Sequence, residues 1–254
     1  MTLDALAFGA HADDVELSCG GTLIKLAGLG YKTGVIALTR GETGTRGSAE
    51  IRTREFADAA EALGLAAHKM LDIPDGRVEV TWENKLKIIA EIRAHRPRIV
   101  FAPYWTDRHP DHENASQLVR AAVYLAGLAK IETGQEAFRP AKLVFCQSRF
   151  EFEPSFVVDI TDAHRQKMSA IRAYASQFFR PDAPQTSSAP AAPAPPPGET
   201  LIARPEFLDH IEARDRRYGA QIGVKFGEPF LVREALKVDD PVAFFGPEYR
   251  WTIP

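Results

Sequence analysis

The sequence has little cysteine, no long apolar run and no recognisable leader. Its two cysteines, Cys19 and Cys146, are too few for a disulfide framework or a cysteine-rich zinc site within one chain. A membrane-spanning helix needs about 18 consecutive apolar residues, which occur nowhere. The first residues lack the basic and apolar regions of a signal peptide. We therefore expect a cytoplasmic protein with no membrane partner and with both cysteines buried as small apolar side chains.

A surplus of basic charge is also missing. The formal net charge is -3 at pH 7, so the protein as a whole does not attract nucleic acid or an anionic membrane, and we expect no nucleic-acid partner. The 254 residues are 45% hydrophobic and 26% charged, which is ordinary for a globular protein. We expect one domain over residues 1–254, interrupted by a flexible insertion at 181–199, where proline and alanine dominate.

Strand and helix patterns alternate along most of the chain. Strands are predicted at 33–39, 99–102, 142–147 and 156–160, after a first strand that ends near residue 10. Helices are predicted at 22–29, 50–63, 84–95, 114–130, 163–178 and 205–218. This alternation predicts an α/β fold: a Rossmann-like three-layer sandwich with a mostly parallel sheet and an active site at the C-terminal ends of the strands.

The first polar cluster follows the first strand directly. The apolar residues 5–10 lead into His11, Asp13 and Asp14 at a single turn. One imidazole and two carboxylates at a strand end are typical of a ligand site in an open α/β sheet. Capping of the next helix by Asp13 or Asp14 explains the carboxylates without any metal, so this turn alone leaves both interpretations open.

A second polar turn, residues 103–112, follows the predicted strand at 99–102 and contributes His109 and His112. Because both turns lie at the C-terminal ends of parallel strands, they can converge. Catalytic zinc sites use three nitrogen or oxygen ligands from the protein and keep one position open. His11, Asp14 and one histidine of the second turn supply that number, which leaves the other histidine and Asp13 for acid–base chemistry.

Together these motifs resemble the LmbE-like (PIG-L) family of zinc-dependent N-acetylglucosaminide deacetylases, close to its bacillithiol-biosynthesis branch. The similar segments are His-Ala-Asp-Asp at 11–14, Gly-Gly-Thr at 20–22, Asp-Arg-His-Pro-Asp-His at 107–112, and residues 44–47, 74–76, 101–104, 157–160, 173–178 and 222–223. They span most of the chain outside the proline-rich insertion. The resemblance implies a homo-oligomer, a trimer or a hexamer.

The resemblance also assigns roles at the two turns. It implies that His11, Asp14 and His112 bind the metal and that Asp13 is the general base. Zinc is the implied metal, although two histidines and a carboxylate also accommodate Fe²⁺, cobalt or manganese. It implies further that His109 stabilises the tetrahedral intermediate and is a candidate to protonate the leaving amine, a role that Asp13 can also fill.

Further expectations concern the orientation of His109 and the oxyanion. The resemblance implies that Asp111 orients His109. The bacillithiol branch tends to place a mobile tyrosine near the oxyanion, whereas this chain has Phe207 there, which cannot donate a hydrogen bond.

The implied substrate is N-acetylglucosaminyl malate, a small N-acetylated amino-sugar conjugate. Its carboxylates need cations, for which Arg46, Arg52, Arg108 and Arg139 are the candidates. Alternatives are a deacetylase of chito-oligosaccharides or of another N-acetyl sugar conjugate, and a sugar-binding module that holds a metal without catalysis.

Overall fold

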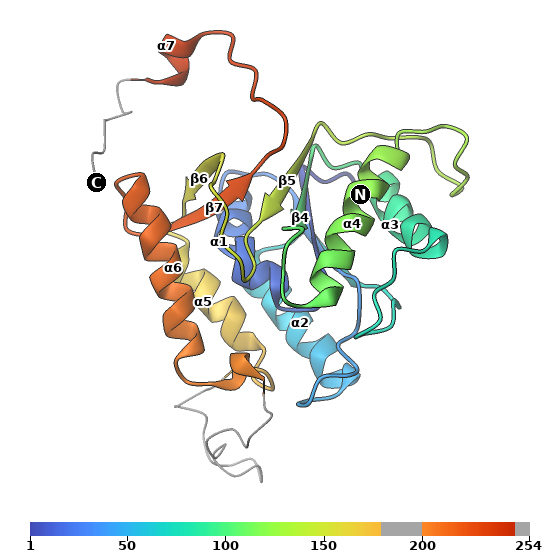
Figure 1. The fold of residues 1–254 in the computed structure, drawn as a ribbon, viewed down its shortest axis with the longest axis horizontal. Helices are drawn as coiled ribbons and strands as arrows, with labels where there is room; N and C mark the ends of the chain where they lie inside the picture. Colours follow the sequence, from blue (N-terminus) through green and yellow to red (C-terminus); the bar gives the residue numbers. More distant parts are fainter. Residues whose placement is uncertain (179–199, 247–254) are drawn as a thin grey trace.

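The computed structural model describes residues 1–178 and 200–246, which form a seven-stranded sheet with helices on both faces (Figure 1). The strands of this part are β1 (Ala5–Gly9), β2 (Thr33–Ala37), β3 (Ala67–Met70), β4 (Ile99–Pro103), β5 (Lys142–Cys146), β6 (Phe156–Asp159) and β7 (Gly227–Leu231). The helices are α1 (Asp14–Gly28), α2 (Ala49–Leu63), α3 (Trp82–His95), α4 (Pro110–Leu125), α5 (His164–Ala173), α6 (Phe207–Gln221) and α7 (Pro241–Phe244), with a 3-10 helix, η1, at Leu201–Ala203. The insertion predicted at 181–199 lies outside the described residues.

The sheet order is β3-β2-β1-β4-β5-β7-β6. The first five strands are mutually parallel, whereas β7 runs antiparallel to both β5 and β6. This confirms the predicted α/β class with a mostly parallel sheet. None of the helices in the described ranges is both long and apolar enough to cross a membrane.

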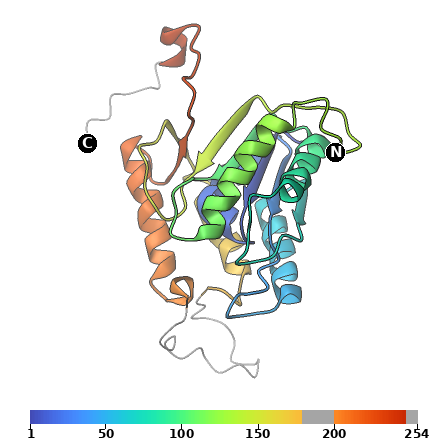
Figure 2. The same ribbon diagram turned by 45° about the vertical axis from the view of Figure 1, so that its right-hand side comes forward.

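The sheet separates the hydrophobic core into two clusters, and the central strand β1 contributes to both. Its residues are all buried, and successive side chains point to opposite faces. Ala7 packs in the cluster that contains Phe56 of α2, whereas Phe8 packs in the cluster that contains Ile88 of α3. Figures 1 and 2 show α3 and α4 on one face and α1, α2 and α5 on the other. Burial on both faces explains why β1 is a continuous apolar run.

Several elements differ from the prediction: helices α1, α4 and α5 have other bounds, and strands β3 and β7 were not predicted. Helix α1 begins at Asp14 instead of residue 22, so the polar turn is shorter than expected. Helix α5 ends at Ala173, five residues before the predicted end, because Tyr174 turns inward and its hydroxyl donates to buried Glu16 Oε1 at 2.8 Å. Strand β3 was not predicted, because its sequence, Ala-His-Lys-Met at the sheet edge, has no apolar pattern.

The position of β1 beside β4 brings the two polar turns together. Ala5 lies opposite Ile99, and Ala7 lies opposite Phe101. Since the two strands are parallel, the turns that follow them leave the sheet at the same edge. The predicted convergence at the C-terminal ends of the strands is therefore present.

Candidate active site

The three predicted metal ligands meet between these turns. His11 belongs to the turn after β1, Asp14 is the first residue of α1, and His112 lies in the first turn of α4. His112 Nε2 is 3.3 Å from His11 Nδ1 and 3.3 Å from Asp14 Oδ1, and His11 Nδ1 is 3.6 Å from Asp14 Oδ2. One atom from each side chain therefore faces a common point.

The outer nitrogens of both imidazoles face carboxylates. His11 Nε2 lies 3.0 Å from Asp75 Oδ1 and 3.3 Å from Asp111 Oδ2, and His112 Nδ1 lies 3.3 Å from Asp107 Oδ2. In neutral rings these outer nitrogens carry the protons, so the inner nitrogens direct lone pairs at each other. A cation placed between two such lone pairs, beside a carboxylate, would be bound by all three groups. The donor set therefore fits a divalent cation.

The electrostatics of the cluster also favour a cation. Burial acts to lower the pKa of His112, but Asp14 and Asp107 outweigh it and raise that pKa to about 10. The pKa of His11 is likewise raised well above its ordinary value, because hydrogen bonds to Asp111, Asp14 and Asp75 outweigh its burial. Surroundings that hold protons so firmly on two imidazoles attract a metal ion for the same reason.

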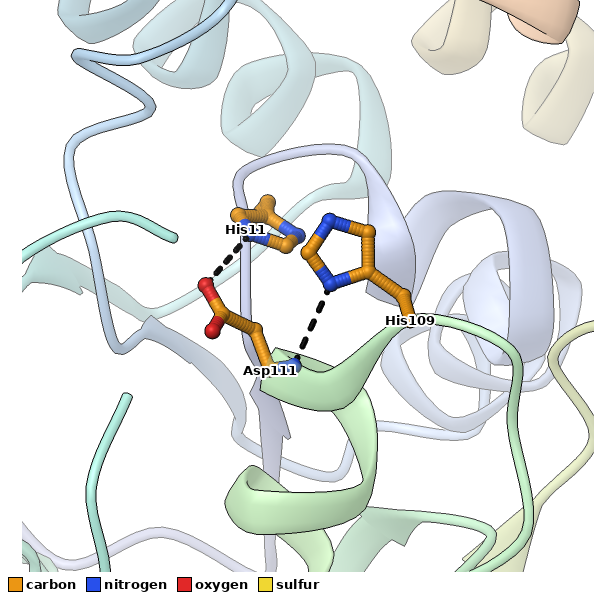
Figure 3. Close-up of side chains that lie close together, drawn as sticks. All are labelled: His11, His109 and Asp111. Carbon is orange, nitrogen blue, oxygen red and sulfur yellow. Dashed lines mark hydrogen bonds and ion pairs between the residues drawn. The ribbon is translucent and has the colours of Figure 1, made fainter. Parts of the chain in front are cut away.

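The carboxylate of Asp111 contacts His11 and not His109, the residue that it was expected to orient (Figure 3). The carboxylate also accepts the N–H groups of Gly76, at 2.8 Å, and Val78, at 3.1 Å. His109 occupies the N-cap position of α4, so its Nδ1 accepts the backbone N–H of Asp111 at 3.2 Å. His11, His109 and Asp111 form a second possible ligand group. The group with Asp14 and His112 is the one in which a nitrogen of His11 and a nitrogen of His112 face each other at 3.3 Å beside a carboxylate, and we take it as the candidate metal site.

Asp13 lies beside the metal ligands in an unusual backbone conformation. It occupies the N-cap position of α1 with a φ of 115°, and its side chain makes no capping hydrogen bond. Helix capping therefore does not explain this carboxylate. Arg52 Nη2 donates to the carbonyl of Ala12 and lies 3.4 Å from Asp13 Oδ2, which holds the strained turn in place. Burial raises the pKa of Asp13 to about 6, although Arg52 opposes the rise.

The four predicted substrate arginines lie in different places. Arg52 lines the pocket above the cluster but is only 4% exposed, and its donors face Ala12 and Asp13. It therefore acts as a positioning residue for Asp13. Arg108 lines the same pocket and is exposed. Arg46 lies in the adjacent loop, where its carbonyl accepts from Gln177 Nε2 at 3.0 Å.

Arg139 lies apart from the other three candidate arginines. Arg139 donates to the carbonyl of Tyr124 at 3.1 Å, and its guanidinium lies 4.7 Å from the centre of the Tyr124 ring. Both residues belong to the C-terminal end of α4 and the connection that follows it, whereas the metal ligand His112 lies in the first turn of that helix. The helix therefore separates Arg139 from the pocket, whose lining does not include it.

The pocket has a volume of about 490 Å³, and its lining includes apolar side chains as well as the polar turns. The apolar residues of η1 and α6 in the lining are Leu201, Ile202, Phe207 and Ile211. Phe207 lies in the lining and stacks on Phe178 with ring centres 5.8 Å apart, so the side chain in place of the expected tyrosine is a packing group. A polar residue of the same helix, His210, also lines the pocket.

Four residues of the site were not predicted as functional. Asp75 and Asp107 face the two imidazoles that are predicted to bind the metal, and both belong to segments of the family resemblance without having been given a role of their own. Arg149 and Arg214 line the pocket. Arg149 follows two polar residues at the end of a predicted strand, and Arg214 lies in a run of charged residues on a predicted helix. The sequence did not distinguish either arginine from a solvated surface charge.

Comparison with known proteins agrees with this geometry. Residues 6–123, which include both polar turns, match the GlcNAc-PI de-N-acetylase (PIG-L) family. The diacetylchitobiose deacetylase of Thermococcus kodakarensis is 32% identical over 186 residues, which cover 68% of this chain and 69% of that enzyme. The chain belongs to the PIG-L family. The match to the family includes Asp13, His109 and all three predicted metal ligands, whereas α6 and β7 of this PIG-L protein lie beyond it.

Two other proteins resemble this PIG-L family member. The 1D-myo-inositol 2-acetamido-2-deoxy-alpha-D-glucopyranoside deacetylase of Kineococcus radiotolerans is 30% identical over 159 residues, which cover 46% of this chain and 44% of that enzyme. The crystal structure of the conserved protein TT1542 from Thermus thermophilus superposes with a TM-score of 0.82 at 38% identity, over 94% of this chain and 98% of that one. The α/β architecture described above is thus shared within the family.

Proposed function

We propose that this PIG-L family chain is a metal-dependent hydrolase that removes the N-acetyl group from an N-acetylglucosaminyl conjugate. The observation that carries the proposal is the convergence of His11 Nδ1, His112 Nε2 and the Asp14 carboxylate beside the buried Asp13. All four residues line a pocket of about 490 Å³, a volume suited to a small-molecule ligand.

His11, Asp14 and His112 would hold the cation. Two imidazoles and one carboxylate match a catalytic zinc site with one open position, so zinc is the proposed metal and Fe²⁺ the alternative. When bound, such a cation supplies Lewis-acid polarisation of the amide carbonyl and makes water more acidic.

Asp13 is the proposed general base. Its pKa of about 6 lies close to neutral pH, where a carboxylate can both accept and return a proton. Asp13 would take a proton from the water that attacks the acetyl carbonyl, while Arg52 keeps the carboxylate in place. The carbon–nitrogen bond then breaks, and the amine leaves with the proton that Asp13 received. Acetate and the free amino sugar are the products.

His109 is proposed as a hydrogen-bond donor to the oxyanion. Because its Nδ1 accepts the N–H of Asp111, the neutral ring carries its proton on Nε2. Partial burial, together with His11 and His112, lowers the pKa of His109. A neutral Nε2–H donor is therefore favoured over an imidazolium, and the proton for the amine is assigned to Asp13.

For the substrate, we propose N-acetylglucosaminyl malate, as in bacillithiol biosynthesis. Arg108 and Arg149 line the pocket, and their side chains form no hydrogen bond or ion pair with any of residues 1–178 and 200–246. Two such guanidinium groups suit the carboxylates of malate. The similarity to a diacetylchitobiose deacetylase favours chito-oligosaccharides as the alternative.

Acetate release from two substrates tests the proposal. The purified protein, reconstituted with zinc or with Fe²⁺, is assayed with N-acetylglucosaminyl malate and with diacetylchitobiose. We expect acetate from both and a higher kcat/KM for the malate conjugate. Equal values would contradict the malate assignment, and no acetate from either substrate would contradict the deacetylase assignment.

The role of Asp13 is tested separately. The Asp13→Ala variant should keep its metal, because Asp13 is not a ligand, and should lose about 10²- to 10⁴-fold in kcat. Metal content is measured by elemental analysis alongside the assay. Undiminished acetate release in Asp13→Ala would contradict the proposed mechanism.

A further inference from the structure

Helix α1 is interrupted at Cys19, which has φ −144° and ψ 17°. Just beyond the break, the N–H groups of Gly21 and Thr22 donate to the two carboxylate oxygens of Glu228, at 2.9 and 2.7 Å, and the Thr22 hydroxyl donates at 2.6 Å. Glu228 belongs to β7 and is fully buried. A carboxylate from a distant strand therefore caps the second half of α1, where the helix presents free N–H groups and a positive dipole end.

The other side of the break is held by Arg214 of α6. Its Nη2 donates to the carbonyl of Leu17 and, at 3.0 Å, to Asp215 Oδ1, which also accepts from Arg214 Nε at 3.2 Å. A regular helix would join the Leu17 carbonyl to the N–H of Gly21. In this protein each of these two groups has a partner outside the helix.

A buried lysine links the two partners. Lys167 Nζ lies 2.6 Å from Asp215 Oδ2 and 2.8 Å from Glu228 Oε1, and all three side chains are fully buried. Arg214, Asp215, Lys167 and Glu228 thus form a chain of alternating charge, which we call the ion chain. Two cations and two carboxylates sum to zero, so the positive charge of Arg214 is compensated within the protein.

One end of the ion chain reaches the pocket. Arg214 lines it together with Leu17 and Ser18, and its position on α6 places it on the same helix face as Phe207 and Ile211. The Nε and Nη2 donors are used, whereas Nη1 forms no hydrogen bond with any residue of the two described ranges. Because the other two nitrogens are bound, the orientation of the guanidinium is fixed.

We propose that Arg214 Nη1 binds neutral oxygen atoms of the substrate, namely sugar hydroxyl groups. Its compensated charge offers a carboxylate little net attraction, whereas its fixed N–H groups suit a hydroxyl acceptor. Arg108 and Arg149 differ, because their charges are uncompensated and suit the anionic part of a conjugate. The pocket thus has separate groups for the sugar and for an acidic substituent, an assignment that rests on the proposed function.

The test compares two substrates and two arginines. KM is measured for diacetylchitobiose, which has no carboxylate, and for N-acetylglucosaminyl malate. Arg214→Lys keeps a cation beside Asp215 but removes the Nη1 group that is proposed to bind the sugar. This variant should raise KM for both substrates by a similar factor of about ten, with the metal content unchanged. Arg149→Met should raise KM for the malate conjugate only. Arg216→Met is the control, because Arg216 is exposed on the same helix and pairs with Glu212.

A binding measurement tests this inference independently of the proposed function, because it requires no turnover. Glucosamine is titrated calorimetrically into the metal-loaded wild type and into the metal-loaded Arg214→Lys variant. Weaker binding by the variant, with a melting temperature close to that of the wild type, supports the inference even if no acetate is released. Unchanged KM and unchanged glucosamine affinity in the folded variant would overturn it, as would a KM increase confined to the malate conjugate.

A structural role alone would give a different pattern. If Arg214 only holds the break in α1, Arg214→Lys should lower metal affinity through Asp14 and should reduce kcat for both substrates. That result, with an unchanged KM, would also overturn the proposal. Arg214→Met serves as a second variant if the lysine substitution fails to fold.

Discussion

The protein contains two buried polar clusters of opposite design. In the ion chain every charge has an oppositely charged partner, and the sum is zero. In the cluster of His11, Asp14 and His112, two imidazole nitrogens face each other at 3.3 Å beside a carboxylate. The charges of the first cluster are satisfied by the protein alone, whereas the donor set of the second fits a cation. Charge balance thus distinguishes the two clusters, although Arg214 at one end of the ion chain also lines the pocket.

Their places in the fold differ as well. The cluster of His11, Asp14 and His112, which we call the unbalanced cluster, lies where the parallel strands β1 and β4 end. This is the usual ligand position in an α/β sheet. The ion chain joins α1, α5, α6 and β7, where the antiparallel edge packs on the parallel part. A buried ion pair is weak evidence for net stability, but removal of one partner is costly. We therefore expect substitutions in the two clusters to affect different properties.

The largest effect is expected at the unbalanced cluster. Asp14→Ala should remove a metal ligand and reduce kcat/KM on the order of 10³-fold or more, because the Lewis acid is lost. Metal content and acetate release are measured together, and Asp58→Ala, an exposed position on α2, is the control. An Asp14→Ala variant that keeps a full equivalent of metal would refute the ligand assignment.

Substitutions in the ion chain should lower the free energy of unfolding. Lys167→Met leaves Asp215 and Glu228 without their buried cation and should lower the free energy of unfolding by about 3–5 kcal/mol. Urea unfolding measures the change. The matched control is Lys87→Met, whose partner Asp72 is exposed, with an expected loss of about 0–1 kcal/mol. Equal losses of unfolding free energy in the two variants would contradict a stabilising role of the buried ion chain.

Residues behind the metal ligands should have an intermediate effect. Asp107→Asn weakens the acceptor for His112 Nδ1 and should lower metal affinity by about 10- to 100-fold. Competition with a chromogenic chelator gives the affinity, and Asp72→Asn on the surface is the control. Wild-type affinity in Asp107→Asn would show that the carboxylate does not support the ligand.

A smaller effect concerns acid stability. Burial acts to raise the pKa of Asp215, but Lys167 and Arg214 outweigh it and lower the pKa below its ordinary value of 3.8. A lowered folded-state pKa stabilises the protein above the unfolded-state value, and this stabilisation is lost as pH falls through the folded-state value. Unfolding free energies should therefore fall below a pH of about 4. The fall should be shallower in Asp215→Asn, and an identical pH profile would contradict this assignment.

The smallest effect is expected at Arg139, which belongs to neither cluster. Arg139→Ala should leave KM and metal content unchanged, and loss of its contact with the Tyr124 ring should cost about 0.5–1 kcal/mol of stability. A KM increase like that of Arg149→Met would place Arg139 in the substrate site after all.

Most of the strands and the two polar turns were predictable, because their signals are local. An apolar run that ends in His11 and Asp14 marks both the first strand and the turn after it, and Gly64 ends α2 as expected, with a φ of 69°. Strand β3 was missed, because an edge strand of polar residues has no such run. Asp75 was missed as a partner of His11, because its function depends on a contact between two turns far apart in the sequence.

The sequence alone thus determined the α/β class and the two polar turns that contain the candidate metal ligands, since each depends on patterns within a few residues. The tertiary structure decided which groups face each ligand. It places the Asp111 carboxylate against His11, Arg52 against Asp13 and Arg139 against Tyr124. It also created the ion chain, because hydrogen bonds and charge compensation depend on distances between elements that no local pattern contains.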